Sequence, residues 1–474
     1  MTTAIFWFTF DLRLHDLPGL AAAMQQHDQV IPVFVLDRSD PWFFGGAGQW
    51  WLHHSLAKLQ DAIAAQGGAL VLRSGDIRTC LRSLIEESGA TELYFSRAYE
   101  PWLAAVQQSL FKSLADQGIG CKRYAGRLLL EPEHILNQQG KPFQVFTPYY
   151  KHCQKILSLP SATKVPKPRW YSDSLNSEAL ETWNLLPTKP NWAKGFGEWQ
   201  PGEAGAHHVL NEAVANRVTN YSTHRDFPAV EGTSRLSPHL HFGEISPRQI
   251  WYTVSHRRSI TSGAAEPFLR QLIWREFSFY LLHHWPQIPE HAFRPAFEQF
   301  PWGKNRKALK AWQRGMTGYP IVDAGMRELW HTGWMHNRVR MIVASFLTKH
   351  LQIHWREGAA WFWDTLVDAD LANNTAGWQW VAGSGADAAP YFRIFNPVLQ
   401  GEKFDGDGDY VSTWIPELAK LPHKHIHKPW LAPEAVLRQA GVELGKTYPL
   451  PIVDHDHARK AALEAYAHIK AGGS

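Results

Sequence analysis

Side chains capable of chemistry are concentrated between Trp334 and Trp380 of this 474-residue chain. Two carboxylates, two amides and two tryptophans lie within thirteen residues near its end, with two arginines upstream: Asp368, Asp370, Asn373, Asn374, Trp378, Trp380, Arg338 and Arg340. Carboxylates accept hydrogen bonds from ligand N–H and hydroxyl groups, and arginines hold phosphate or the negative charge of a reduced ring. The segment therefore predicts a buried pocket for a polar ligand with a flat ring system. An exposed helical loop with capping Asp and Asn residues would not require Trp and Asn to alternate so closely.

Two other segments carry groups suited to a ligand. The stretch EGTSRLS, residues 231–237, combines a glycine with three hydroxyls ahead of a helix, where backbone N–H groups can approach phosphate. Thr-Ser before a helix is also an ordinary N-cap, so this pattern alone leaves both interpretations open. In RQLIWREF, Gln271 and Trp274 are three residues apart and share a helix face. That face is either core with a satisfied amide or the wall of a pocket that reads the edge of a base.

Composition bounds the class of protein. A chain of 474 residues with 45% hydrophobic and 19% charged residues predicts a soluble globular protein of two or three domains. The formal net charge of +4 permits a polyanionic partner without requiring one. The 23 tryptophans exceed ordinary use and suit stacking on bases or flat cofactors as well as core packing.

Cysteine usage and hydropathy bear on location. The three cysteines lack metal-type spacing, so we expect no disulfide framework and no metal site, and a reducing cytoplasm. The N-terminal run IFWFTF is soon interrupted by charge, and no run is long enough to span a bilayer. We therefore expect no signal peptide and no membrane association.

Residues 1–130 alternate strand and helix patterns. Strands are predicted at 5–9, 30–36, 69–72, 93–96 and 121–124, and helices at 17–26, 50–65, 79–87 and 103–116. This alternation predicts a parallel, doubly wound, Rossmann-like α/β domain with helices on both faces. No G-x-G-x-x-G opens the first helix, so a nicotinamide dehydrogenase is not favoured.

The rest of the chain changes character twice. Residues 131–200 are rich in proline and predict a connector that wraps the surface. Residues 201–474 predict an all-α domain, because apolar residues recur at helical spacing in 204–217, 246–255, 267–283, 307–314, 321–332, 337–350 and 461–469.

Seven motifs in order, EGTSRLSPHL, IWREF, TGYPIVDAGMREL, GWMHNRVRM, DADLANN, GWQW and YFRIFNP, resemble the DNA photolyase and cryptochrome family. The match covers residues 201–450 closely and the N-terminal half loosely. It implies a helical domain that holds FAD and an α/β antenna domain with a folate or deazaflavin chromophore. The implied activity is light-driven electron transfer from reduced FAD to a cyclobutane pyrimidine dimer in DNA.

The resemblance also implies residue roles. Positions matching the FAD contacts are Tyr221, Thr233, Ser234, Leu236, Ser237, Arg275, Asn337, Arg340, Asp368, Asp370 and Asn374. Positions matching contacts to DNA or the flipped lesion are Arg225, Gln271, Trp274, Asn337, Arg338, Met341 and Trp380. Trp302, Trp355 and Trp378 match the electron chain that photoreduces the flavin, and Asn374 matches the residue that faces flavin N5.

Several positions depart from the family pattern. Gln271 stands where cyclobutane-dimer photolyases have a glutamate, and glutamine there resembles (6-4) photolyases and animal cryptochromes. Asn337 and Met341 match the cyclobutane type instead. Thr9 and Phe10 replace commonly charged residues of the first strand, and Trp102 and Leu103 replace polar folate contacts, which leaves the antenna open.

The preferred hypothesis is a bacterial-type, monomeric cyclobutane pyrimidine dimer photolyase that acts on UV-damaged DNA, single or double stranded. The alternatives are a cryptochrome-like blue-light photoreceptor without repair and a (6-4) photolyase. The absence of a long tail after the predicted helix 461–469 favours repair over signalling.

Overall fold

The structure is a computed structural model that describes residues 1–159, 161–388 and 392–471. The chain forms two compact units. The first comprises Met1–Asn191, Gly197–Thr219 and Ser234–Pro286, and the second comprises Trp192–Phe196, Asn220–Thr233 and Gln287–Ser474.

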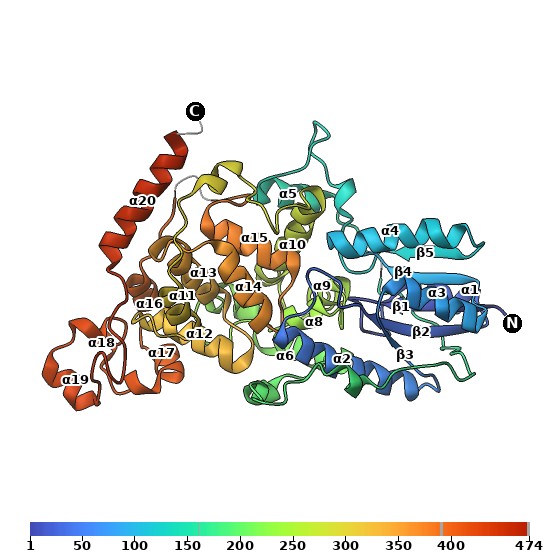
Figure 1. The fold of residues 1–474 in the computed structure, drawn as a ribbon, viewed down its shortest axis with the longest axis horizontal. Helices are drawn as coiled ribbons and strands as arrows, with labels where there is room; N and C mark the ends of the chain where they lie inside the picture. The colour runs from blue at the N-terminus through green and yellow to red at the C-terminus, as the bar shows by residue number, and fades with distance from the viewer. Residues whose placement is uncertain (160, 389–391, 472–474) are drawn as a thin grey trace. The chain divides into compact units, whose positions relative to one another are not determined.

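The first unit contains a parallel five-stranded sheet with strand order β3-β2-β1-β4-β5 (Figure 1). The strands are β1 (Thr3–Phe8), β2 (Gln29–Leu36), β3 (Val71–Ser74), β4 (Glu92–Ser96) and β5 (Gly120–Tyr124). The three inner strands are almost wholly buried because helices cover both sides of the sheet. The order reverses at β1, so the sheet is doubly wound and the predicted α/β class is confirmed.

Helices pack on the sheet according to the alternation of side chains along β1. Ile5 and Trp7 face the helices α3 (Ile77–Ser88) and α4 (Pro101–Ala115) in one apolar core. Phe6 faces the opposite side, where its ring lies 3.0 Å from the position of a Cβ added to Gly19 in α1 (Pro18–Gln26). The remaining helices of this unit are α2 (Gly46–Ala64), α5 (Phe146–Ile156), α6 (Glu203–Asn216), α8 (Ser237–His241), α9 (Pro247–Ser255) and α10 (Ser262–His284).

Residues 131–200 differ from the expected connector by containing a full helix, α5. Phe146, Tyr149, Tyr150 and Cys153 are buried along one face of α5 and pack toward α10. The spacing of these four residues is helical, but prolines on both sides of the helix obscure the pattern.

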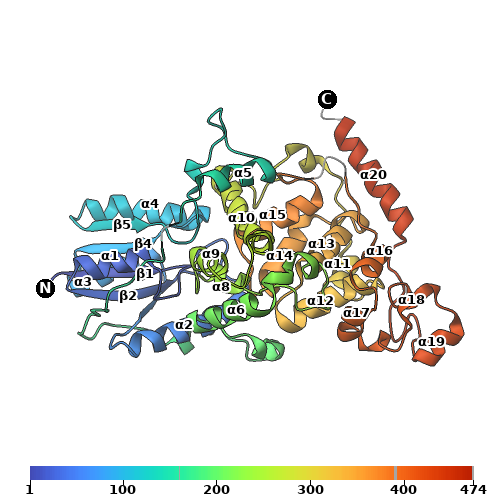
Figure 2. The ribbon, with the colours of Figure 1, turned by 180° about the vertical axis from the view of Figure 1, so that it is seen from behind.

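The second unit is helical, as predicted, and no strand is found among its described residues (Figure 2). Its helices are α7 (Tyr221–His224), α11 (Arg306–Gln313), α12 (Pro320–Thr332), α13 (Asn337–Ser345), α14 (Trp355–Thr365), α15 (Leu371–Ala382), α16 (Pro397–Phe404), α17 (Asp409–Trp414), α18 (His423–Ile426), α19 (Glu434–Ala440) and α20 (His455–Ala471). Its main core joins α12, α13, α14 and α15.

The predicted helix at 337–350 contains a change of winding. α13 continues into a π-helical turn, Phe346–His350, whose five residues are all buried. A π turn carries one more residue per turn than an α-helix and is often found at functional sites. Here it places the polar side chains Lys349 and His350 in the interior of the unit.

None of the helices in the described ranges is both long and apolar enough to cross a bilayer. Within those same ranges, no cluster of three or more His, Cys, Asp or Glu side chains is arranged to hold a metal ion.

Candidate functional site

In the second unit, the predicted cofactor residues of DADLANN are organised around an ion pair. Arg340 of α13 donates from one Nη to Asp368 Oδ2 at 2.8 Å and from Nε to the Met335 carbonyl at 2.7 Å. The Asp368 carboxylate is 4% exposed and the Arg340 side chain 23% exposed. The buried acid therefore fixes the guanidinium, while part of the Arg340 side chain remains exposed.

Asp370 begins α15 and serves two purposes. Its Oδ1 accepts from the backbone N–H of Asn373 at 2.8 Å, which makes it the N-cap, and from Asn373 Nδ2 at 2.9 Å. The cap fixes where α15 begins, and it thereby fixes the positions along the helix of Asn373, Asn374 and Trp378.

Asn374 and Trp378 are one turn apart on α15 and both contact α14. Asn374 Nδ2 donates to the Ala359 carbonyl at 3.0 Å. The Trp378 ring lies over Gly358 so closely that a Cβ added to this glycine would be 2.0 Å from Cη2 of the indole. The two helices are thus in contact because residue 358 has no side chain.

The three predicted electron-chain tryptophans occur in one neighbourhood of the second unit. Trp355 and Trp378 are each 2% exposed and belong to the main helical core, and Trp302 packs against that core while partly exposed. Trp355 begins α14. Gly358, against which the Trp378 ring packs, is one turn further along the same helix. All three tryptophans thus belong to or pack against the same helical core, two of them buried and one partly exposed.

The N-terminus of α13 presents three of the predicted lesion residues together. Asn337 Nδ2 lies 3.9 Å from Met341 Sδ, and Arg338 Nη1 lies 4.0 Å from the same sulfur. Arg338 also forms an ion pair with Asp226 at 2.7 Å and lies over the Phe404 ring. His336 caps the helix, because its Nδ1 accepts from the Arg338 N–H at 3.2 Å.

The segment Asn220–Thr233 supplies three further predicted residues of the second unit. Arg225 lies with its guanidinium carbon 5.7 Å from the Tyr221 ring centroid. The backbone at Gly232 lies close to the His224 carbonyl. A Cβ added to Gly232 would be 2.6 Å from the His224 carbonyl oxygen, so the close approach requires glycine. Thr233 follows directly and is partly exposed.

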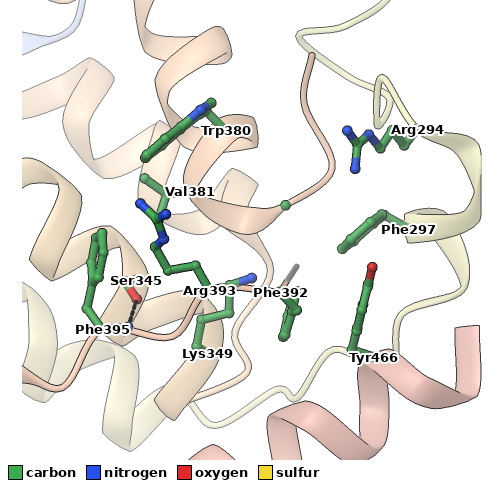
Figure 3. A pocket seen from close by; sticks show the side chains of 11 residues that line it. Arg294, Phe297, Ser345, Lys349, Trp380, Val381, Phe392, Arg393, Phe395 and Tyr466 are labelled. Atoms are coloured by element: carbon green, nitrogen blue, oxygen red, sulfur yellow. Dashed lines mark hydrogen bonds between the residues drawn. The ribbon is translucent and has the colours of Figure 1, made fainter. Parts of the chain in front are cut away.

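Trp380 lines a small pocket that contains three basic side chains (Figure 3). Arg294 and Arg393 are exposed, whereas Lys349 is 1% exposed and donates from Nζ to the Ala382 carbonyl at 2.7 Å. Burial holds the pKa of Lys349 well below its usual value. The pocket of about 20 Å³ has room for about one water molecule, and no carboxylate is found among the described residues that line it. Its mouth therefore favours an anionic group.

In the first unit, Gln271 and Trp274 lie one turn apart on α10, as their spacing predicts. The Trp274 ring stacks on Phe146 of α5 with a centroid distance of 3.5 Å and an angle of 7°. Gln271, one turn earlier and partly exposed, donates from Nε2 to the Pro267 carbonyl at 3.0 Å. Its Oε1 is directed away from that contact, so the amide can still accept a hydrogen bond.

Arg275 and Glu276 follow on α10 and connect it to residues 127–130. Arg275 donates from Nη1 to the Arg127 carbonyl at 3.0 Å. Glu276 accepts from the backbone N–H groups of Leu129 at 2.9 Å and Leu130 at 3.2 Å. Burial raises the pKa of Glu276 to about 8, although Arg275 and these N–H groups act in the opposite direction.

The predicted phosphate-binding stretch ends in the first unit. Arg235 adopts a left-handed conformation with φ of 56°, and Ser234 Oγ accepts from the Leu236 N–H at 3.4 Å. Leu236 is buried, whereas Ser237 is exposed at the start of α8. The stretch is therefore a tight turn with its hydroxyl groups near the surface of this unit.

Sequence reasoning did not identify four polar residues near these groups: Arg294, Lys349, Arg393 and His354. Arg393 lies inside the YFRIFNP motif, so the motif itself was a usable signal. Lys349 was not recognisable, because an ordinary helix at 337–350 gives no reason to bury a lysine.

The donors present suit FAD in each unit separately. In the second unit, the Arg340–Asp368 pair and Asp370 offer a charge-assisted donor and acceptors for the polar edge of a ring or for ribose hydroxyls. In the first unit, the hydroxyls of Ser234 and Ser237 are placed at a turn ahead of a helix, where phosphate is well accommodated.

Comparisons with known proteins agree with this geometry. Residues 268–468 match the family model "FAD binding domain of DNA photolyase", and residues 4–169 match the model "DNA photolyase". A curated relative from Agrobacterium fabrum, "Deoxyribodipyrimidine photo-lyase", is 51% identical over 473 residues that cover 98% of each chain. Cryptochrome-2 of Arabidopsis thaliana is 38% identical over 98% of this chain and 79% of its own length.

A solved structure described as a bacterial class III photolyase from Agrobacterium tumefaciens is also similar. It superposes with a TM-score of 0.96 at 51% identity and covers 99% of this chain and 98% of its own. The α/β sheet, the helical unit and its flavin-suited residues thus define an FAD-binding flavoprotein. More particularly, the chain belongs to the DNA photolyase and cryptochrome family.

Proposed function

We propose that this protein is a photolyase that uses light to split cyclobutane pyrimidine dimers in DNA. The observation that carries the proposal is the N-terminus of α13, where Asn337 and Arg338 both contact Met341 and all three side chains are at least partly exposed. This amide, cation and thioether combination matches the lesion contacts of the cyclobutane type. The chain's 51% identity to a curated deoxyribodipyrimidine photo-lyase supports the same assignment.

The proposed lesion residues divide into stacking and polar groups. Enzymes that act on a base in a duplex must extrude it, as photolyases do, and the extruded base then needs flat apolar walls. Trp274 and Trp380 are the proposed walls. The Trp274 ring is held in orientation by Phe146, and the Trp380 Nε1 donates to the Asp387 carbonyl at 3.1 Å. Arg225 and Arg338 would neutralise phosphates that flank the lesion.

Reduced FAD, when bound and excited by light, supplies the electron that opens the dimer. The chain's residues do the remaining work. Arg340 would hold negative charge at the ring, with Asp368 fixing its direction, and Asp370 would accept from ring or ribose groups. Asn374, whose amide is anchored to the Ala359 carbonyl, would face flavin N5. Tyr221, Thr233, Ser234, Leu236, Ser237, Arg275 and Asn337 are proposed as the remaining FAD contacts.

Trp302, Trp355 and Trp378 are proposed to refill the flavin with electrons from the surface. Phenylalanine at any one of them should slow photoreduction of oxidised FAD, while repair by chemically pre-reduced enzyme should persist. If none of the three substitutions slowed photoreduction, the tryptophans would be core residues only.

Gln271 is the observation that favours a second function, a cryptochrome-like photoreceptor without repair. A carboxyl group could share a proton with a dimer carbonyl as charge develops, whereas glutamine can donate only an amide N–H. In the structure, Gln271 Nε2 already donates to Pro267. The amide has a second N–H, so repair remains chemically feasible at a lower yield per photon.

The deciding experiment is a repair assay on single-stranded DNA that contains a cyclobutane dimer, with and without blue light. We expect light-dependent repair, and a matched (6-4) substrate should remain unrepaired. Gln271→Glu should raise the yield, and Gln271→Leu should lower it because the base edge loses its partner. If neither the parent protein nor Gln271→Glu repaired the dimer, the receptor function would replace the repair function as the proposal.

The finer statements about the protein's setting are also part of the proposal. We place it in the cytoplasm as a monomer that binds UV-damaged DNA, single or double stranded, and that carries a second chromophore of folate or deazaflavin type. We assign residues 1–130 to the antenna domain, 131–200 to the connector and 201–474 to the FAD- and DNA-binding domain. Size-exclusion chromatography and the absorption spectrum of chromophores released by heat test the monomer and the antenna.

A further inference from the structure

His354 lies between two members of the proposed electron chain. Its ring centroid is 5.0 Å from that of Trp302 and 5.6 Å from that of Trp355, at interplanar angles of 55° and 33°. The imidazole is therefore the ring that touches both indoles. The two indoles, both within the described residues, make no ring contact with each other.

The backbone fixes this arrangement from both sides. Gly303 donates its N–H to the Gln352 carbonyl at 2.7 Å and pairs with Ile353 in a short parallel bridge. Trp302 and His354, each adjacent to this bridge, are thereby held next to each other. Gln352 adopts φ of 50°, an uncommon conformation for a residue with a side chain, which ends the preceding helical segment and turns the chain into α14.

The hydrogen bonding of His354 determines its protonation form. Nδ1 accepts from the Arg356 N–H at 3.1 Å and caps α14, so the proton of the neutral ring is on Nε2. A second proton would have to bind Nδ1 and would therefore break the hydrogen bond from the Arg356 N–H that caps α14. Burial lowers the pKa of His354 to about 4, with the Arg356 guanidinium acting in the same direction and Glu298 in the opposite one.

We propose that His354 is an aromatic bridge for electron transfer from Trp302 to Trp355, an inference that rests on the proposed photoreduction by tryptophans. One electron passes from Trp302 through the contacting imidazole to oxidised Trp355. Trp302 is left oxidised, and an external thiolate returns one electron to it and becomes a thiyl radical. His354 gains and loses no proton in this step, because Nδ1 is occupied by the cap and Nε2 already carries hydrogen. Its neutral state avoids placing a positive charge beside an indole that must itself become positive.

Two substitutions separate the ring from the cap. Asparagine is among the best N-cap residues, so His354→Asn keeps the helix start and removes the ring. Phenylalanine keeps an aromatic ring and loses the cap. We expect His354→Asn to retain the thermal midpoint and to slow bleaching of oxidised FAD under blue light by about tenfold, which corresponds to a barrier about 1.4 kcal/mol higher. His354→Phe should lower the thermal midpoint and retain most of the rate.

A merely structural role predicts the reverse order, with His354→Phe the slower variant, and that result would overturn the proposal. Equal rates in His354→Asn and the parent protein would also overturn it, provided that Trp302→Phe and Trp355→Phe are slow. Normal rates in those two tryptophan variants would instead remove the electron chain on which the proposal rests. Repair by pre-reduced enzyme is measured in parallel and reports on the lesion chemistry alone.

A second measurement is independent of photoreduction. In the holoenzyme with ¹⁵N-labelled histidine, His354 is assigned by comparison with the His354→Asn spectrum. We expect a ring that is neutral and protonated on Nε2 at pH 7 and still mostly neutral at about pH 5, where an imidazole with an ordinary pKa of about 6.5 would be mostly charged. A charged ring at pH 7, or a proton on Nδ1, would overturn the bridge in the form proposed here.

Discussion

Gly358→Ala is the substitution whose effect the structure defines most sharply. The added Cβ would lie 2.0, 2.4 and 2.6 Å from three carbons of the Trp378 ring. Ordinary contact begins near 3.4 Å, so the ring and α14 must separate by about 1.4 Å. Ala359, the residue after Gly358, accepts a 3.0 Å hydrogen bond from Asn374 Nδ2 through its carbonyl. Separation of α14 from the Trp378 ring would stretch that bond.

The cost follows from two opposing effects. Alanine is favoured over glycine in a helix interior by up to about 1 kcal/mol, whereas overpacking of a core costs about 1–3 kcal/mol. The 2.0 Å approach places the overpacking cost in the upper part of its range, so we expect a net loss of about 1–2 kcal/mol in the free energy of unfolding. For a helical unit of about 200 residues, this loss lowers the thermal midpoint by about 2–8 °C. Photoreduction of FAD should slow as well, because Trp378 leaves its position against α14.

Thermal unfolding and the bleaching rate of oxidised FAD under blue light are the two assays. Gly263→Ala is the matched control, since Gly263 lies at the exposed start of α10 with no heavy atom within 4 Å of an added Cβ. That variant should be as stable as the parent protein or slightly more so, with unchanged photoreduction. If Gly358→Ala retained both the midpoint and the rate of the parent protein, the close contact of α14 with Trp378 would be refuted.

Three further predictions concern DNA and pH. Arg338→Ala should weaken DNA binding and flatten the plot of log affinity against log salt by about 0.7 for single strands, the value for one lost phosphate contact, as measured by fluorescence anisotropy. Trp274→Ala should reduce the preference for damaged over intact strands by about 1–3 kcal/mol, and an unchanged preference in the same titration would place the lesion elsewhere. The pKa of Glu276 is raised in the folded state, so the folded protein binds this proton more tightly and its stability should decline between about pH 4.5 and pH 8. Glu276→Gln, compared with the parent protein in denaturant unfolding at pH 5 and pH 8, should remove that part of the decline.

The α/β unit was largely predictable because its strands are short apolar runs bounded by turn residues. VIPVFVL at 30–36, for example, is β2 with one residue added at its start. Element starts were less accurate where proline was involved. The helix predicted to begin at Pro267 begins at Ser262, because Thr261 caps it through the Ala264 N–H and proline is accommodated inside.

The proposed site was predictable in its residue types and less so in its geometry. The motifs indicated Arg340 and Asp368 as cofactor residues, and the structure shows that these two side chains form an ion pair. No pattern in the sequence indicated that Trp378 would rest on Gly358, because a contact between separate helices leaves no local periodicity. His354 was likewise missed, since a histidine that caps a helix and one that bridges two tryptophans look the same in sequence.

The π turn at Phe346–His350 has a consequence for how this stretch can vary in length. Deleting one of its residues would restore ordinary α-helical winding and leave the chain that follows near its present orientation, because the π turn holds one extra residue. Deleting a residue from the α-helical part, Asn337–Ser345, would instead rotate everything that follows by about 100°. The bridge of Ile353 to Gly303 would then be out of register. A deletion scan from residue 337 to residue 350, scored by flavin content, should therefore show greater losses in the α-helical part than in the π turn.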